Sequence, residues 1–498
     1  MAHPDVPHWV DGAPLSGSGG FAPVHDPATG TVVARVSLAT AADVDSVVAS
    51  ASRAASGWAR TSLAQRTQVL FRMRELLVAQ RIHLAELVTR EHGKVLADAE
   101  AEVARALDAV EFACGLSAHL EGAHTVGVST GVDVHSLRQP VGVTAVVSPF
   151  NFPVMVPMWF IPLAVACGNS VVLKPSERCP SAPTELARLW SQAGLPDGVL
   201  DVVHGAAPAV DALLEHPDVD AVSFVGSTPV ARHVYAAAAR SGKRVQALGG
   251  AKNHMVVLAD ADLDVAAAAA VSAACGAAGE RCMAVSVLVA LDEVADELVE
   301  RVAHRMAALR VGDGRGGADM GPLISAEHRD RVAGVVTSAA RDGARVILDG
   351  RGVTVPGAPG GYWFGPTLLD HVTEDMEAYR REIFGPVLCV VRVGSFAQAL
   401  ELVNRSPYGN GAAVFTRDGG AARRFEAEVQ AGMVGVNVPI PVPVASYSFG
   451  GWKGSLFGDV HAHGPAGVQF FTRAKVVTSR WPDEAASEAP VLSFPRSA

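Results

Sequence analysis

A cysteine that directly follows an arginine is the pair of neighbours best suited to chemistry in this chain. Arg281 and Cys282 lie in the segment GERCM, residues 279–283, after an alanine-rich stretch and just before an apolar one. A thiolate is a soft nucleophile, and an adjacent guanidinium can favour the thiolate or hold an anion. A free cysteine is also often a small buried apolar residue with no chemistry of its own. The pentapeptide leaves both interpretations open, so the elements and motifs around it are needed to choose.

Strands and helices alternate on both sides of this segment. Near-continuous apolar strands that alternate with helices predict parallel sheets covered on both faces. A second alternating series runs from residue 263 to residue 437, beginning with a helix at 263–278. We therefore expect an α/β protein with two parallel-sheet domains. The first series consists of apolar runs at residues 141–147, 170–173, 200–203, 221–225 and 255–258, with helices expected between them at 154–167, 181–193, 207–215 and 229–240.

The two ends of the chain differ from this pattern. Residues 1–30 are rich in Gly, Pro and Ser and suggest an extended arm, whereas residues 40–120 carry apolar side chains at helical spacing. Residues 123–138 suggest a protruding hairpin, which a strand expected at 468–480 could join, within one chain or across subunits. The last residues are polar and contain proline, which is typical of a loose tail.

Composition excludes several classes of protein. The chain has 498 residues and a net charge of −10, so no nucleic-acid groove is indicated. The longest apolar stretch, residues 154–167, is interrupted by prolines and is too short to span a membrane. No signal-peptide pattern opens the chain. Six cysteines without a CxxC pair favour a reduced, cytoplasmic protein over a disulfide scaffold.

Two other motifs carry no chemistry in this interpretation. A GxGxxG pattern at residues 312–317 follows a helix rather than a strand, so we interpret it as a flexible loop and not as a dinucleotide site. His461 and His463 have no further ligands at metal spacing, so we expect a solvated loop and no metal site.

Two strand ends offer contacts to a nucleotide. The strand at 170–173 leads into Lys174 and Glu177, and the strand at 221–225 leads into Ser227 and a helix. Ligands of parallel sheets bind beyond the carboxyl ends of the strands. A lysine and a carboxylate can hydrogen-bond ribose hydroxyls, and small residues at a helix start let N–H groups approach a pyrophosphate. A surface ion pair and ordinary helix capping are the alternatives at these two places.

Six short motifs lie along the chain: SPFNFP at residues 148–153, LKPSE at 173–177, FVGS at 224–227, LGG at 248–250, GERCM at 279–283 and EIFGP at 382–386. Taken in order, they resemble the aldehyde dehydrogenase superfamily. Their order and spacing cover nearly the whole chain, which makes coincidence improbable. The resemblance implies NAD-dependent oxidation of an aldehyde on a catalytic cysteine, in a dimer or tetramer.

The resemblance implies roles for individual residues. Cys282 is the implied nucleophile, and the Asn151 amide with the Cys282 N–H is the implied oxyanion hole. Asn151 as a mere turn residue, or Glu382 as a helix-end charge, is no longer favoured once every motif occurs in order. The implied NAD contacts are Ser148, Phe150, Lys174 and Glu177 (adenosine ribose), Arg178, Ser227 (pyrophosphate), Gly249 and Glu382 (nicotinamide ribose).

The chain departs from the hydrolytic members of the superfamily at one motif. Ala247 stands just before Leu-Gly-Gly, where those members carry a glutamate base, and an extra residue, Ala251, precedes the lysine. Loss of a general base typically lowers the rate by roughly 10²–10⁴-fold. We therefore expect coenzyme A, rather than water, to accept the acyl group.

This departure, with GAKNH at 250–254 and GGWKGS at 450–455, resembles the CoA-acylating methylmalonate-semialdehyde or malonate-semialdehyde dehydrogenase branch. That branch oxidises and decarboxylates its substrate to propionyl-CoA or acetyl-CoA. The substrate's carboxylate needs a cationic clamp, and the resemblance implies Arg281 and Arg105. A surface ion pair with Glu102 or Asp108 is the alternative for Arg105.

The sequence leaves other functions open. Hydrolytic oxidation of another aldehyde is the alternative function, and a non-catalytic binding protein on the same fold is a third. The choice between methylated and unmethylated substrate, and between inositol and valine catabolism, is also open. We expect an NAD-binding domain from residues 1–122 and 141–249, a catalytic domain from 250–448, oligomerisation strands at 123–140 and 466–482 that build a homotetramer or dimer, and a loose tail at 483–498.

Overall fold

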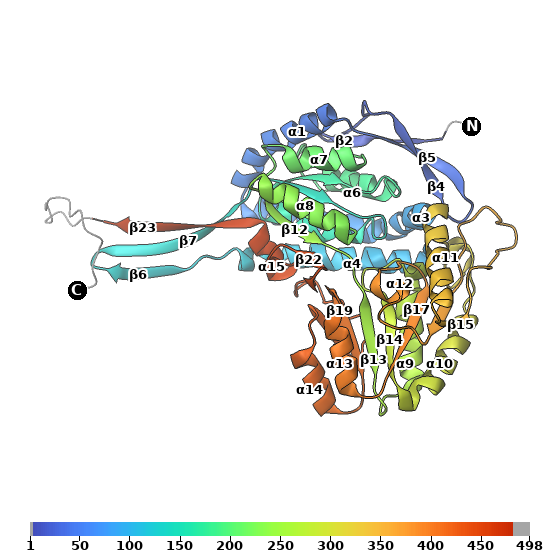
Figure 1. The fold of residues 1–498 in the computed structure, drawn as a ribbon. Helices are drawn as coiled ribbons and strands as arrows, with labels where there is room; N and C mark the ends of the chain where they lie inside the picture. Colours follow the sequence, from blue (N-terminus) through green and yellow to red (C-terminus); the bar gives the residue numbers. More distant parts are fainter. Residues whose placement is uncertain (1–2, 482–498) are drawn as a thin grey trace.

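Two large sheets, one in each half of the chain, hold most of the strands. The computed structural model describes residues 3–481 and shows the sheets in two lobes, with a three-stranded arm projecting from the upper lobe (Figure 1). The central strands are buried on both faces, as apolar parallel strands require. This arrangement of two parallel-sheet α/β domains and a small β extension is the one that the sequence predicts.

The first sheet has eight strands in the order β22-β12-β11-β8-β9-β10-β2-β3. The strand order reverses at β8, because β9 and β10 lie on one side of it and β11 and β12 on the other. Such a switch point opens a crevice beyond the carboxyl ends of the strands, where ligands bind. The parallel strands are β8 (Val143–Val147), β9 (Ser170–Lys174), β10 (Leu200–Val202), β11 (Ala221–Val225) and β12 (Arg244–Leu248), flanked by antiparallel β22 (Leu456–Phe457), β2 (His8–Val10) and β3 (Ala13–Leu15).

Helices cover both faces of this sheet. The predicted helices are present as α5 (Met155–Ala166), α6 (Ser181–Gln192), α7 (Ala207–Glu215) and α8 (Thr228–Arg240). Four more precede the sheet: α1 (Ala41–Arg60), α2 (Leu63–Ala79), α3 (Arg81–His92) and α4 (Leu96–Cys114).

The extended arm predicted for residues 1–30 is wrong in its detail. This segment forms edge strands because its short runs find partners in sheets that form elsewhere in the chain. Strands β2 and β3 extend the first sheet, while β1 (Asp5–Val6) and β4 (Phe21–Asp26) pair with β5 (Thr31–Ser37).

The second sheet has seven strands in the order β15-β16-β17-β14-β13-β19-β20. The run at 255–258, grouped above with the first series, belongs here as β13, and β16 is a strand that the sequence did not reveal. The strands are β13 (Asn253–Val257), β14 (Val285–Leu291), β15 (Arg345–Leu348), β16 (Thr367–Asp370), β17 (Val387–Val393), β19 (Gly411–Phe415) and β20 (Met433–Val436). The helices around it are α9 (Leu263–Cys275), α10 (Asp292–Ala307), α11 (Ala326–Arg341), α12 (Glu377–Arg380), α13 (Phe396–Arg405) and α14 (Gly419–Glu428).

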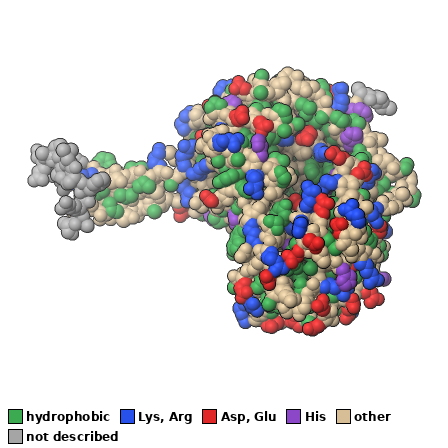
Figure 2. All heavy atoms as spheres, viewed as in Figure 1, with side chains coloured by type: hydrophobic (Ala, Val, Ile, Leu, Met, Phe, Trp, Pro, Cys, Tyr) green, Lys and Arg blue, Asp and Glu red, His purple; other side chains and the backbone are tan. Residues whose placement is uncertain are grey.

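The arm is a three-stranded antiparallel sheet within one chain. Its strands are β6 (His124–Ser129), β7 (Val132–Pro140) and β23 (Thr472–Arg480), in the order β23-β7-β6. The strand predicted at 468–480 begins only at Thr472, because α15 (Gly464–Phe470) occupies the residues before it. Apolar side chains are visible along the arm (Figure 2). On β6 and β23, Val126 and Val476 are 73% and 66% exposed. The tail predicted at 483–498 lies outside the described residues.

Several smaller expectations can be compared with the structure. The GxGxxG loop packs against the start of α4, since a side chain on Gly314 would lie 2.7 Å from the Lys94 carbonyl oxygen. His463 is buried, not solvated, and contacts the rings of Trp159 and Phe449. Each of the six cysteines is a free thiol. Over residues 3–481, no helix is both long and apolar enough to cross a membrane, and no cluster of three metal-ligating side chains forms.

Candidate active site

The residues after the parallel strands meet at one edge of the first sheet. Ser148 and Asn151 follow β8, Lys174 ends β9, Ser227 follows β11 and Gly249 follows β12. Because β8 is the switch point of the sheet, the first two residues lie at the crevice where a ligand is expected. The structure thus gathers the predicted cofactor contacts from separate motifs at a single edge.

Asn151 connects this edge to the loop that carries Cys282, the predicted nucleophile. Its side chain is 4% exposed, and Nδ2 donates a 2.9 Å hydrogen bond to the carbonyl oxygen of Glu280. Its own carbonyl oxygen accepts a 2.6 Å hydrogen bond from Lys94 Nζ. The predicted oxyanion-hole amide is therefore fixed from both its side chain and its backbone.

A buried ion pair supports the Asn151 loop. Lys94 Nζ lies 2.7 Å from Glu102 Oε2, and both side chains are fully buried. Glu102 Oε1 accepts hydrogen bonds from the N–H groups of Val154 and Met155, at 2.8 and 3.1 Å, where α5 begins. A carboxylate is favourable at a helix N-terminus. The sequence did not reveal Lys94, since it lies 57 positions from Asn151 and no motif links the two. Glu102, considered as a surface partner of Arg105, is instead buried against Lys94.

The turn before the nucleophile is left-handed. Ala277, Ala278 and Gly279 have φ angles of 49°, 53° and 72°, so the helix predicted to reach residue 278 ends at Cys275. A non-glycine residue in this region costs roughly 1–2 kcal/mol. Such residues persist where surrounding contacts impose them, and they cluster at functional sites. Glycine is needed at 279 because a side chain there would collide with the Gly385 carbonyl.

Cys282 is held as a neutral thiol in this arrangement. Burial raises its pKa to about 12, and the nearby charge of Glu382 acts in the same direction. The backbone N–H groups of Cys282 and Met283 and the charge of Arg281 oppose this shift without overcoming it. The Cys282 carbonyl oxygen accepts hydrogen bonds from the amides of Asn253 and Asn410, at 2.9 and 3.2 Å. Both amides fix the nucleophile's backbone, and neither role was visible in the sequence.

The two arginines predicted to hold a carboxylate each have an acidic partner on α4. Arg281 Nη2 lies 2.8 Å from Asp98 Oδ1, and Arg105 Nη1 lies 3.0 Å from Asp108 Oδ2. The Arg105 side chain is 44% exposed, which agrees with the surface ion pair weighed above. The charge of Arg105 also contributes to lowering the pKa of His463, so the two side chains lie in one region. The carboxylate clamp stays a prediction.

Polar groups without partners mark the cofactor side of the site. Ser148 Oγ is buried and has no hydrogen-bond partner. Ser227 begins α8, yet its side chain forms no capping hydrogen bond. Lys174 Nζ lies 2.7 Å from the Gly205 carbonyl oxygen and 3.5 Å from Glu177 Oε2. A lysine–carboxylate pair can hydrogen-bond ribose, and a hydroxyl at a helix N-terminus can approach a pyrophosphate. These residues therefore fit a dinucleotide.

The other predicted cofactor contacts, Glu382, Phe150 and Gly249, are held by contacts within the chain. Glu382 Oε1 accepts a 3.0 Å hydrogen bond from Ala251 N–H, and burial raises its pKa to about 7. Phe150 stacks on His92 at a centroid distance of 5.8 Å and meets Phe384 edge-on at 5.9 Å. A side chain on Gly249 would lie 2.8 Å from the Gly454 carbonyl oxygen, so chain packing also requires this glycine.

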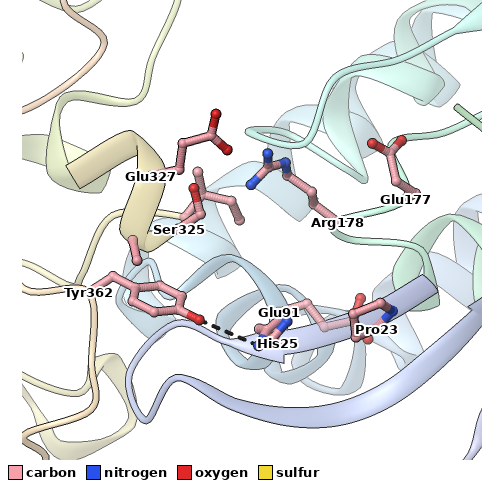
Figure 3. Close-up of a pocket in the computed structure, with 10 residues that line it drawn as sticks. Pro23, His25, Glu91, Glu177, Arg178, Ser325, Glu327 and Tyr362 are labelled. Atoms are coloured by element: carbon pink, nitrogen blue, oxygen red, sulfur yellow. Dashed lines mark hydrogen bonds between the residues drawn. The ribbon is translucent and has the colours of Figure 1, made fainter. Parts of the chain in front are cut away.

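Glu177 and Arg178 line a cavity of about 380 Å³ between the lobes. Figure 3 shows the Arg178 side chain extending toward Ser325 and Glu327, where α11 begins. The opposite wall includes His25, whose Nδ1 lies 3.4 Å from the Tyr362 hydroxyl. Arg178 therefore faces a space bounded by both lobes.

Ala247 and Leu248 lie on opposite faces of β12, which bears on where the glutamate base of hydrolytic relatives would stand. Ala247 lies beside Phe224 of β11 and packs in the apolar cluster beneath α1, α7 and α8. Leu248 faces the opposite cluster, which contains Met283 and contacts Cys282. Counted backward from Lys252, Leu248 occupies the glutamate's place, and Ala251 is no longer an extra residue. The expectation that Ala247 vacates the base position is thus wrong by one residue, while the absence of a carboxylate there holds.

Comparison with known proteins identifies the family. The family model described as "Aldehyde dehydrogenase family" matches residues 15–477 of the chain. The chain belongs to the aldehyde dehydrogenase family. This aldehyde dehydrogenase is 50% identical to a malonate-semialdehyde dehydrogenase of Pseudomonas aeruginosa over 490 residues, which are 98% of this chain and 99% of that protein.

Solved structures agree with the fold of this aldehyde dehydrogenase. A methylmalonate-semialdehyde dehydrogenase from Oceanimonas doudoroffii matches with a TM-score of 0.96 and 47% identity, covering 98% of this chain and all of the other (100%). A candidate methylmalonate-semialdehyde dehydrogenase from Sinorhizobium meliloti, solved with NAD, matches with a TM-score of 0.96 and 48% identity, covering 97% of this chain and 99% of the other. The predicted family and fold class are confirmed.

Proposed function

We propose that this aldehyde dehydrogenase oxidises malonate semialdehyde, or its methyl derivative, with NAD and transfers the resulting acyl group to coenzyme A. The observation that carries the proposal is the pairing of a cysteine nucleophile with a strand end that presents Leu248 instead of a carboxylate. Relatives named malonate-semialdehyde dehydrogenase, 46–50% identical to this chain, support the choice of substrate.

The first step is addition of the Cys282 thiol to the aldehyde carbon. A sulfur–carbon bond forms, the thiol proton passes to water, and the electron pair of the carbon–oxygen π bond moves to the aldehyde oxygen, where negative charge develops. The amide of Asn151 and the Cys282 N–H donate to that oxygen; removing one such donor typically costs roughly 10²–10³-fold in rate. Bound NAD would accept the hydride from the former aldehyde carbon, and Lys174, Glu177, Ser227 and Glu382 would hold the cofactor. Cys282 then carries a thioester.

Decarboxylation follows from the chemistry of that thioester. The substrate's carboxylate lies beta to the thioester carbonyl, so the carbon–carbon bond can break with release of CO₂. The bonding electron pair passes to the thioester oxygen as an enolate, which the same two donors stabilise. Protonation of the enolate carbon gives an acetyl or propionyl group on Cys282.

Transfer to coenzyme A completes the cycle. The CoA sulfur attacks the thioester carbonyl, Cys282 leaves as the thiolate, and acetyl-CoA or propionyl-CoA forms. Thiolates attack thioesters without a base that activates water, which suits a site with Leu248 at the base position. The hydrolytic alternative would need another base, and Glu382 is the carboxylate whose charge reaches Cys282.

The proposal is tested by comparing substrates and products. The purified enzyme, with NAD and CoA, is given malonate semialdehyde, methylmalonate semialdehyde or propanal, and the products are identified by mass spectrometry. We expect acetyl-CoA and propionyl-CoA from the two semialdehydes, with a higher kcat/KM than for propanal. A higher kcat/KM for propanal than for both semialdehydes would overturn the proposed substrate class.

We also propose that the arm joins subunits into a homo-oligomer. Its exposed side chains Val126, Val128, Leu137 and Val476 would otherwise leave an apolar sheet in water. A second copy of the chain can cover that surface. Light scattering of the wild type and of V126D/V476D tests this: the double variant should have a lower mass, and a wild-type monomer would contradict the proposal.

A further inference from the structure

Asp98 contacts both ends of the left-handed turn that precedes the nucleophile. Its Oδ2 accepts a 2.9 Å hydrogen bond from the N–H of Ala277, and its Oδ1 accepts a 2.8 Å hydrogen bond from Arg281 Nη2. The Asp98 and Arg281 side chains are only 25% and 20% exposed, which shields the pair from water. One carboxylate thus joins α4 to the first residue of the strained turn and to Arg281, two residues beyond its end.

The position of Asp98 in α4 shows that its carboxylate serves the loop and not the helix. An acidic residue in the first turn commonly reaches back to the capping residue's N–H. Asp98 is in the first turn of α4, yet the start of α4 has no side-chain capping hydrogen bond. The carboxylate instead binds Ala277, which has a φ of 49°. This contact opposes the tendency of Ala277 and Ala278 to leave the left-handed region.

The Arg281 guanidinium also occupies a space that the chain leaves for it. It lies over Gly276, where any side chain would collide with its nitrogens. Asp98, Gly276 and Arg281 line one wall of a cavity of about 560 Å³, which also includes His304 and Arg305. Neither Cys282 nor Asn151 lines this cavity. The link from the Asp98-bound guanidinium to the site is its positive charge, which acts to lower the pKa of the Cys282 thiol.

We propose that Asp98 is a positioning residue with two effects. It holds residues 277–279 in their left-handed turn, and it directs the Arg281 guanidinium toward the carboxylate of the substrate. A guanidinium has five N–H donors in a fixed fork, so a partner on one amino nitrogen leaves other donors for a second carboxylate. The second effect rests on the proposed function, through the role of Arg281, whereas the first does not.

Three variants separate the two effects. Asp98→Asn keeps an oxygen for the Ala277 N–H but turns an amide NH₂ toward the guanidinium. Asp98→Ala removes both contacts, and D98A/A277G adds a glycine that adopts the left-handed conformation without the side-chain penalty. Glu100→Gln is the matched control, since Glu100 lies in the same region of α4 and pairs with Arg81 at 3.5 Å.

The readout is the NADH burst of the NAD-saturated enzyme in stopped flow, with malonate semialdehyde and with propanal. For D98N, we expect the half-saturating semialdehyde concentration to rise about tenfold or more, with the propanal burst within about threefold of wild type. D98A should slow the propanal burst about tenfold or more. The double variant D98A/A277G should restore the rate of that burst without restoring the affinity for the semialdehyde. E100Q should match the wild type.

Two results would overturn the proposal. One is that D98N raises the half-saturating concentrations of malonate semialdehyde and propanal equally. The other is that the burst kinetics of D98N and D98A match those of E100Q. Thermal melting checks folding, and if D98A does not fold, the contrast between substrates in D98N decides. The burst precedes acyl transfer, so a failure to form acetyl-CoA would contradict the proposed function while leaving the D98N contrast intact.

Discussion

Asn151 Nδ2 donates a 2.9 Å hydrogen bond to the carbonyl oxygen of Glu280, two residues before Cys282. The amide that would stabilise the oxyanion is thus tied to the backbone that carries the nucleophile. We predict that Asn151→Ala lowers the rate of the NADH burst by roughly 10²–10³-fold, the usual effect of losing one oxyanion-hole donor. Stopped-flow absorbance measures it, with alkylation of Cys282 by iodoacetamide as a control for an intact thiol. A burst within threefold of the wild type would remove Asn151 from the oxyanion hole.

The buried pair of Lys94 and Glu102 should matter to stability far more than a surface pair. Glu102→Ala leaves the Lys94 ammonium buried without its carboxylate and removes the acceptor for two N–H groups of α5. We expect a loss of about 3–5 kcal/mol in the free energy of unfolding. Asp108→Ala, which breaks the exposed pair with Arg105, should cost about 0–1 kcal/mol. Urea denaturation measures both, and similar losses would show that the buried pair has no special role.

The two faces of β12 predict different effects for two neighbouring glutamates. Leu248→Glu places a carboxylate on the face that contacts Cys282, so release of free acid without CoA should rise about tenfold or more. Ala247→Glu places the same group in the apolar cluster beneath α8, where it should lower the melting temperature without promoting hydrolysis. Quantifying free acid by mass spectrometry distinguishes them. Greater hydrolysis by A247E than by L248E would restore Ala247 as the base position.

Alkylation of Cys282 should depend steeply on pH. A pKa of about 12 leaves little thiolate near neutrality, so the rate without cofactor should rise about tenfold per pH unit and still be rising at pH 9. Glu382 raises this pKa through its negative charge, so Glu382→Gln should lower the pKa and speed alkylation. Glu377→Gln, which removes an acidic group paired with Arg381, is the control. Iodoacetamide labelling followed by peptide mass spectrometry gives the rates, and a wild-type plateau below pH 9 would contradict the assignment.

Much of the fold follows from apolar periodicity. Strand β11 (Ala221–Val225) and helix α7 (Ala207–Glu215) begin and end where the pattern predicts. Strand β12 was missed because Arg244 and Gln246 interrupt its apolar residues, so it does not form a continuous run. The run at 255–258 was grouped with the wrong sheet, since no local signal marks where the chain passes from one lobe to the other.

Site residues that lie in sequence motifs were predictable, whereas those that act through packing contacts distant in sequence were not. Cys282, Asn151 and Glu382 lie in motifs that the family resemblance identifies. Lys94 and Asp98 act through contacts that span 57 and 183 positions, which sequence spacing cannot reveal. The one-residue error at Ala247 has the same origin, because only the structure shows which side chain of β12 belongs to the apolar cluster that Cys282 contacts.

The central claim is that CoA, and not water, removes the acyl group from Cys282. The most direct measurement is the stoichiometry of NADH formed from excess malonate semialdehyde and NAD without CoA, followed by addition of CoA. We predict a burst of about one NADH per active site, then a slow phase, and continuous turnover with acetyl-CoA formation once CoA is present. Steady release of free acid at the same rate before and after CoA is added would contradict it.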